Sequence, residues 1–359
     1  MSESSDTMNE ASANFFRALL DAPSPSGFEQ PVQAVVREYA GSFTDEVTTD
    51  THGNVVAIIN PGLSRRIMLA GHCDQVGLLV HHIDKDGFLY VQPIGGCDVN
   101  MFIGRAVNIW TANGPVTGAI SRKAIHLLSE DERKQVPKIS DLWIDIGVHD
   151  DAAANALVRV GDPVTVDLGY RELTDGRVFG PGMDDKAGVW VVFEALRRAS
   201  EKGPTCAISA VSTVQEEIGF RGAKTSAYTI DPQVGIVVDV THDTSCPTSD
   251  KRQESDIALG RGPVIYRGAN LNPKVVDLLI ETAQNCEIPF QLAAISAPTP
   301  TDANAIQISR AGIATGLVSI PNRYMHSSVE TVSLSDMEHA AGLVAEFCVR
   351  MTPDVDLTP

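Results

Sequence analysis

The chain has 359 residues, of which 43% are hydrophobic and 21% charged, so it can bury a substantial core and does not have the composition of a disordered sequence. Its 28 Lys and Arg against 46 Asp and Glu give a formal net charge of −18, which repels nucleic-acid phosphates and anionic lipid surfaces. These values argue against nucleic-acid and membrane partners, and the length favours two domains over one.

The cellular location is predicted from three features. The six cysteines form no close-spaced pair, as is usual for free core cysteines in a reducing compartment. The first ten residues are polar and acidic, without the basic and apolar regions of a signal peptide. A membrane span needs about 18 consecutive apolar residues, and no such run occurs. We therefore expect a cytoplasmic protein.

The first strong pattern along the chain is an apolar strand over residues 66–71 that ends in His72-Cys73-Asp74. Residues 77–91 and 106–118 then alternate around Asp-Gly and Asn-Gly, the dipeptides that favour tight hairpin turns. The pair His81 and His82 lies in the first hairpin, where we expect one core and one surface residue of a strand. This part of the sequence predicts a small β-rich domain.

Carboxylates dominate the second half. Asp184 and Asp185 follow a Gly-Pro-Gly turn and precede an amphipathic helix. Glu216 and Glu217 end an apolar strand, and a third strand ends at Asp239. A fourth strand, residues 312–320, leads to His326 and Glu330. A last helix is expected from Asp336, with Ser335 and Glu338 as a capping box and a buried stripe of Met337, Ala341, Val344 and Cys348.

These strand ends predict a metal site. Ligands of open α/β sheets bind beyond the carboxyl ends of the strands, where loops meet helix N-termini. Two adjacent buried carboxylates such as Glu216 and Glu217 are costly unless a cation offsets their repulsion. Two histidines and three carboxylates, one of them bridging, would serve two zinc, cobalt or manganese ions, a pair typical of hydrolases.

The ordered motifs resemble a known family. His-x-Asp, Asp-Asp-Lys-x-Gly, Glu-Glu-x-Gly-x-Arg-Gly-Ala, Asp and His-Ser-x-x-Glu are similar to the dinuclear metallo-aminopeptidases that include tetrahedral, glutamyl and deblocking aminopeptidases, some labelled endoglucanases. The resemblance covers almost the whole chain and extends to residues 26–29 and 301–303. The large insertion lies between the first and second ligands, whereas carboxypeptidase- and deacetylase-type relatives have theirs between the fourth and fifth.

The resemblance implies an α/β metallopeptidase domain, a mixed sheet flanked by helices, formed by residues 1–74 and 177–359. Residues 75–176 would form an inserted, β-barrel-like dimerisation domain, and the assembly would be a hollow dodecamer with inward-facing sites. Gln75 stands where the family usually has Glu, and Lys186 where Arg is commoner.

The resemblance also implies the roles of the site residues. Asp184 would bridge two divalent ions, zinc by preference and cobalt or manganese otherwise. His72 and Asp239 would complete one ion's ligands, and Glu217 and His326 the other's. Glu216 would be the general base that activates a metal-bridged water, and Asp74 would orient His72. The activity implied is removal of N-terminal residues from short peptides.

Two alternatives stay open. A deacylase of N-acyl amino acids or a deblocking hydrolase would differ in not requiring a free amino terminus. A metal-binding assembly scaffold without turnover ranks last, because Glu216 and all five ligands are present. The sequence shows no aromatic sugar platform for an endoglucanase. It leaves open the preferred N-terminal residue, the native metal and the choice between dimer and dodecamer.

Overall fold

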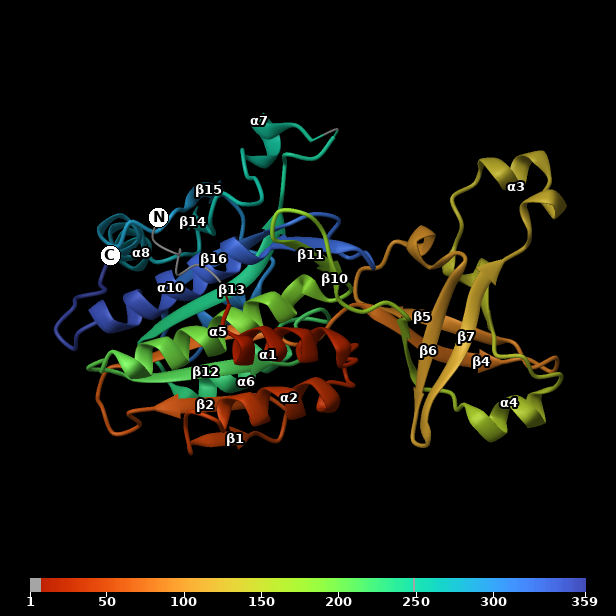
Figure 1. The fold of residues 1–359 in the computed structure, drawn as a ribbon, viewed down its shortest axis with the longest axis horizontal. Helices are drawn as coiled ribbons and strands as arrows, with labels where there is room; N and C mark the ends of the chain where they lie inside the picture. The colour runs from red at the N-terminus through yellow and green to blue at the C-terminus, as the bar shows by residue number, and fades with distance from the viewer. Residues whose placement is uncertain (1–7, 248) are drawn as a thin grey trace.

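The computed structural model describes residues 8–247 and 249–359. The first seven residues, where part of the signal-peptide prediction falls, lie outside that description. The chain forms two lobes (Figure 1): a large sheet covered by helices, and a smaller barrel that protrudes to one side. This arrangement confirms the predicted fold class of a mixed α/β body with a β-barrel-like insertion.

The larger lobe is built on an eight-stranded mixed sheet with the order β1-β2-β12-β3-β13-β16-β14-β15. Its four central strands are mutually parallel, and antiparallel neighbours flank them on either side. The central strands are almost fully buried, as near-continuous apolar runs predict. The strands are β1 (Val47–Thr49), β2 (Val55–Ile59), β3 (Arg66–His72), β12 (Ala207–Thr213), β13 (Val234–His242), β14 (Val264–Gly268), β15 (Gln291–Ile295) and β16 (Ala314–Asn322).

Helices cover both faces of this sheet. Gly71 of β3 abuts α5, whereas Gly235 of β13 abuts α9 on the opposite face. Helices α8 and α10 accompany α5, and α6 packs with α9. The helices of this lobe are α1 (Glu10–Asp21), α2 (Gln30–Ala40), α5 (Met183–Glu201), α6 (Arg221–Ile230), α7 (Lys251–Glu254), α8 (Pro273–Asn285), α9 (Asp302–Ile306) and α10 (Leu334–Arg350).

The parallel central strands bring their carboxyl ends to one edge of the sheet. His72 is the last residue of β3, and β12 leads directly into the turn that carries the two glutamates. Asp239 does not end its strand as expected, because β13 and β16 stay paired for three further residues, to His242. Its position is still level with His72, since Val237 pairs with Ala70 two residues earlier on each strand.

A small three-stranded sheet joins the chain returning from the barrel to this edge. Its order is β10-β11-β17, all antiparallel, and Gly180 pairs with Glu330. Because of this pairing, the turn before Asp184 lies next to the loop that carries His326. The strands are β10 (Arg171–Glu172), β11 (Arg177–Gly180) and β17 (Glu330–Ser333).

The smaller lobe is a closed barrel with the strand order β4-β5-β8-β7-β6-β9 and its own apolar core. Both predicted hairpins are present, as the pairs β4–β5 and β6–β7. The exact domain boundaries stay a prediction. The elements are β4 (Gly77–Ile83), β5 (Leu89–Ile94), β6 (Arg105–Thr111), β7 (Gly114–Arg122), β8 (Leu142–Asp145), β9 (Pro163–Val166), α3 (Glu130–Lys134), α4 (Asp151–Leu157) and the 3₁₀ turns Val99–Phe102, Ile125–Leu127 and Ile139–Asp141.

Two local predictions were wrong. His81 and His82 are both exposed, because the register of β4 against β5 shifts between Val80 and His82 and breaks the alternation. The last helix begins at Leu334 after Ser333 and has no side-chain cap. The carboxylate of Glu338 is bound by Arg198 at 2.6 Å instead of reaching back to the helix start. The predicted stripe along the helix is buried, as expected.

Among residues 8–247 and 249–359, none of the helices combines the length and the hydropathy that crossing a bilayer requires.

Candidate metal centre

Five of the predicted site residues converge at the carboxyl edge of the central strands. One ligand atom from each of His72, Asp184 and Asp239 lies within 4.8 Å of the others. The same is true of Asp184, Glu217 and His326. The two groups share Asp184, so the five side chains form two adjoining triads of possible metal ligands.

Asp184 divides its two carboxylate oxygens between the triads. Its Oδ1 lies 3.1 Å from Nε2 of His72, and its Oδ2 lies 3.3 Å from Nε2 of His326. Asp184 and Asp185 depart from helical dihedral angles at the start of α5, which places Asp184 at the sheet edge before the regular helix begins. A carboxylate turned in this way can offer one oxygen to each of two cations.

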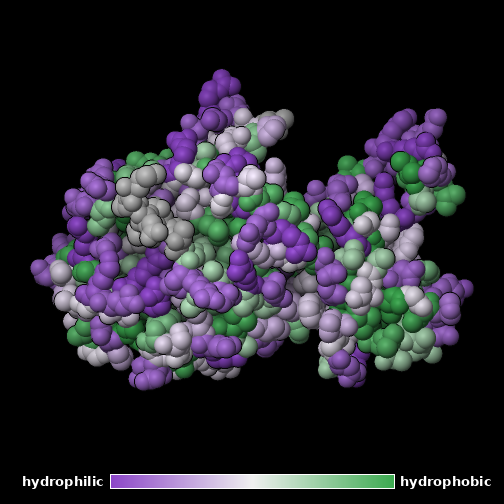
Figure 2. Space-filling model, in the orientation of Figure 1, coloured by the Kyte–Doolittle hydropathy of each residue, from purple (hydrophilic) through white to green (hydrophobic). Residues whose placement is uncertain are grey.

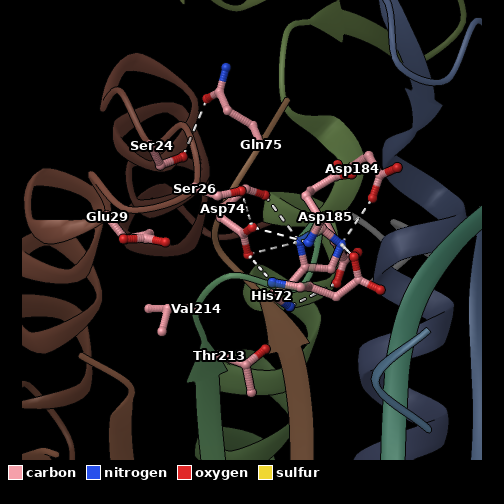
Figure 3. A network of polar contacts seen from close by, with 12 residues as sticks. Ser24, Ser26, Glu29, His72, Asp74, Gln75, Asp184, Asp185, Thr213 and Val214 are labelled. Carbon is pink, nitrogen blue, oxygen red and sulfur yellow. Dashed lines mark hydrogen bonds and ion pairs between the residues drawn. The ribbon is translucent and has the colours of Figure 1, made fainter. Parts of the chain in front are cut away.

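Asp74 and Asp184 lie on opposite sides of the His72 ring (Figure 3). The carboxylate of Asp74 accepts hydrogen bonds from the backbone N–H groups of Glu216 (2.9 Å) and Glu217 (3.2 Å), and from Ser26 Oγ (2.7 Å). Nδ1 of His72 lies 3.0 Å from the carbonyl oxygen of Asp74 and 3.5 Å from its carboxylate. The carbonyl is therefore the nearer partner of the imidazole, and the carboxylate holds the Glu-Glu turn in place.

The adjacent glutamates point to different parts of the centre. Glu217 Oε1 lies 3.5 Å from Nε2 of His326, within the second triad. Glu216 belongs to neither triad, and its Oε2 lies 3.9 Å from Nε2 of His72. Of the two, only Glu217 is thus placed as a possible metal ligand.

The electrostatics of the centre fit divalent cations. Burial raises the pKa of Glu216 to about 10 and that of Glu217 to about 8, and repulsion from neighbouring carboxylates adds to both shifts. Burial likewise raises the pKa of Asp239 well above its ordinary value. Oε1 of Glu217 is buried and has no hydrogen-bond partner among the described residues. Positive charge among these oxygens would offset both the burial and the repulsion, and mixed imidazole and carboxylate donors suit zinc, cobalt or manganese.

Two supporting carboxylates carried no predicted role. Glu330 accepts the backbone N–H of Asp184 (3.1 Å) and of His326 (2.7 Å), so it ties the shared ligand to a histidine of the second triad. Asp185 accepts the backbone N–H of His72 (3.2 Å) and that of Gly188 (3.0 Å). Asp185 belongs to the motif Asp-Asp-Lys and Glu330 to the motif His-Ser-x-x-Glu. Their positions could therefore be seen in the sequence, although their contacts could not.

The barrel lobe also reaches the second triad, through Gly95 and Gly96, for which no role was predicted. The carbonyl oxygen of Gly96 lies 2.7 Å from Nδ1 of His326. Gly95 has φ +73, and a Cβ added there would lie 3.0 Å from Val76 and 3.3 Å from Oε2 of Glu217. The inserted lobe therefore touches both side chains that distinguish the second triad from the first.

The two departures from the resemblance at Gln75 and Lys186 are partners in space. Lys186 is completely buried, and its Nζ donates to Oε1 of Gln75 (2.7 Å) and to the carbonyl oxygen of Ala22 (2.7 Å). Burial lowers the pKa of Lys186 to about 7. Gln75, two residues before β4, is thereby linked to the first turn of α5.

The chain is similar to known proteins in sequence and in fold. The family model described as M42 glutamyl aminopeptidase matches residues 53–343. The lysyl aminopeptidase of Pyrococcus furiosus is 35% identical over 96% of this chain and 98% of its own. The crystal structure of a TET aminopeptidase from Thaumarchaeota archaeon SCGC AB-539-E09 covers 96% of this chain and 97% of its own, with 34% identity and a TM-score of 0.91. The TET1 peptidase of Pyrococcus horikoshii, described as able to assemble into a tetrahedron or a large octahedral shell, covers 95% of this chain and 100% of its own, with 28% identity and a TM-score of 0.84.

Proposed function

Since this chain belongs to the M42 glutamyl aminopeptidase family, we propose that it is a two-metal aminopeptidase that removes N-terminal residues from short peptides. The observation that carries the proposal is the orientation of Asp184, whose two oxygens face His72 and His326 separately. A site for one metal ion would not require the two oxygens of Asp184 to face different histidines.

The ligand assignment follows from the two triads. His72, Asp184 and Asp239 would hold one divalent ion, and Asp184, Glu217 and His326 the other. When bound, such a pair of ions lowers the pKa of water and stabilises negative charge on a carbonyl oxygen. Zinc is the preferred ion, with cobalt or manganese as alternatives.

Glu216 is the proposed general base. It lies beside the first triad without belonging to either, so its carboxylate is free to accept a proton from the attacking water and pass it to the leaving amine. Asp74 fixes the backbone of both glutamates by accepting their N–H groups. Glu216 thus acts on the proton, and Asp74 keeps its carboxylate in position.

The test of this function is the polarity of cleavage. If the free α-amine anchors the substrate, a Leu-initiated peptide should lose residues one at a time from its N-terminus, while the same peptide with an acetylated N-terminus should be cut at least about 100-fold more slowly. Mass spectrometry of the products measures the cleavage of the free and of the acetylated peptide separately. Faster cleavage of the acetylated peptide would move the assignment to a deblocking hydrolase or deacylase, and cleavage of neither peptide by metal-loaded protein would favour the scaffold.

We also propose that the protein self-associates in the cytoplasm, first into dimers and then into a dodecamer. Large hydrophobic side chains are exposed on the barrel lobe, including Leu157 (46%) and Val160 (62%) at the end of α4, and Figure 2 shows hydrophobic residues gathered in this region. The assembly described for the Pyrococcus horikoshii peptidase supports the proposal. Six free cysteines fit a reducing compartment.

The barrel lobe should also support the second metal ion. In Gly95→Ala, the new methyl group would press on Glu217 and Val76. We expect the variant to bind one metal ion with unchanged affinity and the other at least about 10-fold more weakly, as measured by calorimetric titration of the metal-free protein. The matched control is Gly104→Ala, because Gly104 has a similar φ of +78 and nothing within 4 Å of the added carbon. Equal metal binding by the two variants would show that strain, and not contact with Glu217, explains any effect.

A further inference from the structure

A cavity of about 340 Å³ opens beside both triads and extends away from them along the sheet edge. Its near wall is the metal centre itself. Its far wall comes from neighbouring strands: Val240 of β13, Leu317 of β16, Tyr266 of β14 and Ile295 of β15. A volume of this size suits one amino-acid side chain together with the peptide group that carries it.

The far wall is mostly apolar, and its polar groups are neutral hydroxyls. Several of its hydroxyl groups have partners within the protein: Tyr266 Oη pairs with Thr241 Oγ1 at 2.7 Å, and Thr299 Oγ1 accepts from Asn270 at 3.2 Å. Neutral hydroxyl groups can exchange hydrogen bonds with a polar side chain, but they cannot compensate a buried charge, and a hydrocarbon side chain needs no such partner.

The charges around the cavity are confined to its metal side. Among the described residues that line it, there is no lysine or arginine, and every carboxylate is either a member of a triad or Glu216. The other lining residues that can titrate are Tyr266 and His242, and His242 is exposed at the end of β13. An acidic side chain in the cavity would find no fixed cation, and a basic one would find no carboxylate apart from the metal ligands and the base.

We infer that this cavity receives the side chain of the substrate's N-terminal residue and selects apolar side chains of medium size, such as Leu and Met. The inference rests on the proposed function and adds the substrate class to it. The free energy needed to bury an unpaired charge against apolar walls is far larger than the binding free energy lost when a side chain is shorter by a methylene group. Selection therefore runs against Glu and Lys more strongly than against Ala, and it differs from the preferences in the names of the glutamyl family and the lysyl relative.

The direct experiment is a panel of aminoacyl-p-nitroanilides hydrolysed by the zinc- or cobalt-loaded protein. The expected kcat/KM for Leu and Met exceeds that for Glu and Lys by at least about 100-fold, and that for Ala by about 10-fold or more. A higher kcat/KM for Glu or Lys than for Leu would overturn the inference and leave the aminopeptidase function intact. If neither the panel substrates nor any free peptide were hydrolysed, the proposed aminopeptidase function itself would be wrong.

A charge placed in the far wall tests the location of the pocket. Ile295 is half-buried at the end of β15, so Ile295→Lys introduces a cation without opening the core. The ratio of kcat/KM for Leu over Glu should fall at least about 10-fold. Leu292→Lys is the matched control, because Leu292 lies on the same strand, is 52% exposed and does not line the cavity. An unchanged ratio in a folded Ile295→Lys variant, or an equal fall in both variants, would overturn the assignment of this cavity.

Discussion

The Glu216→Gln variant should keep both metal ions and lose turnover by about 10²–10⁴-fold, because the amide preserves the shape of the side chain but cannot accept a proton from water. Glu216 lies outside both triads, so its replacement leaves the proposed ligands intact. The measurement is kcat on a Leu substrate, together with elemental analysis of the same sample.

The matched control for Glu216→Gln is the same substitution at the neighbouring residue, Glu217. Glu217→Gln alters a member of the second triad, 3.5 Å from His326, and should reduce the metal content to about one ion per chain. The two substitutions are adjacent in sequence and chemically identical, so general damage to the turn would affect both in the same way. If Glu216→Gln lost metal and Glu217→Gln kept it, the two roles would have to be exchanged.

The convergence of the site could be predicted because strand ends carry most of it. His72, Glu216 and Glu217 follow apolar runs that had to be buried strands, and parallel pairing brings the carboxyl ends of such strands to one edge. Asp239 was located on the right strand but not at its end, since the length of a strand depends on its partner. Only the fold shows that β13 continues beside β16.

Other features depend on contacts between distant segments, which no local pattern reports. The carbonyl oxygen of Gly96 carries no side-chain signal, yet it lies 2.7 Å from a histidine 230 positions away. Ser335 and Glu338 had the spacing of a capping box, but Arg198 of another helix binds Glu338 instead. The far wall of the cavity was invisible for the same reason, because Tyr266 and Ile295 lie on strands without any motif.

Removing the metal should have the largest effect. Without cations, burial raises the pKa of Glu216 to about 10 and that of Glu217 to about 8, so both side chains hold a proton at neutral pH. A protonated Glu216 is unable to act as a base, and no divalent ion is then present to lower the pKa of the attacking water. Dialysis against a chelator should therefore abolish hydrolysis to the limit of detection, and zinc or cobalt should restore it.

The most direct test of metal sharing by Asp184 is to titrate the metal-free protein with zinc or cobalt while release of the N-terminal residue from a Leu-peptide is followed. If two ions share Asp184, full activity is reached at about two equivalents of metal per chain. Full activity at one equivalent or below would contradict the two-metal centre, and undiminished activity in the metal-free protein would contradict metal dependence altogether.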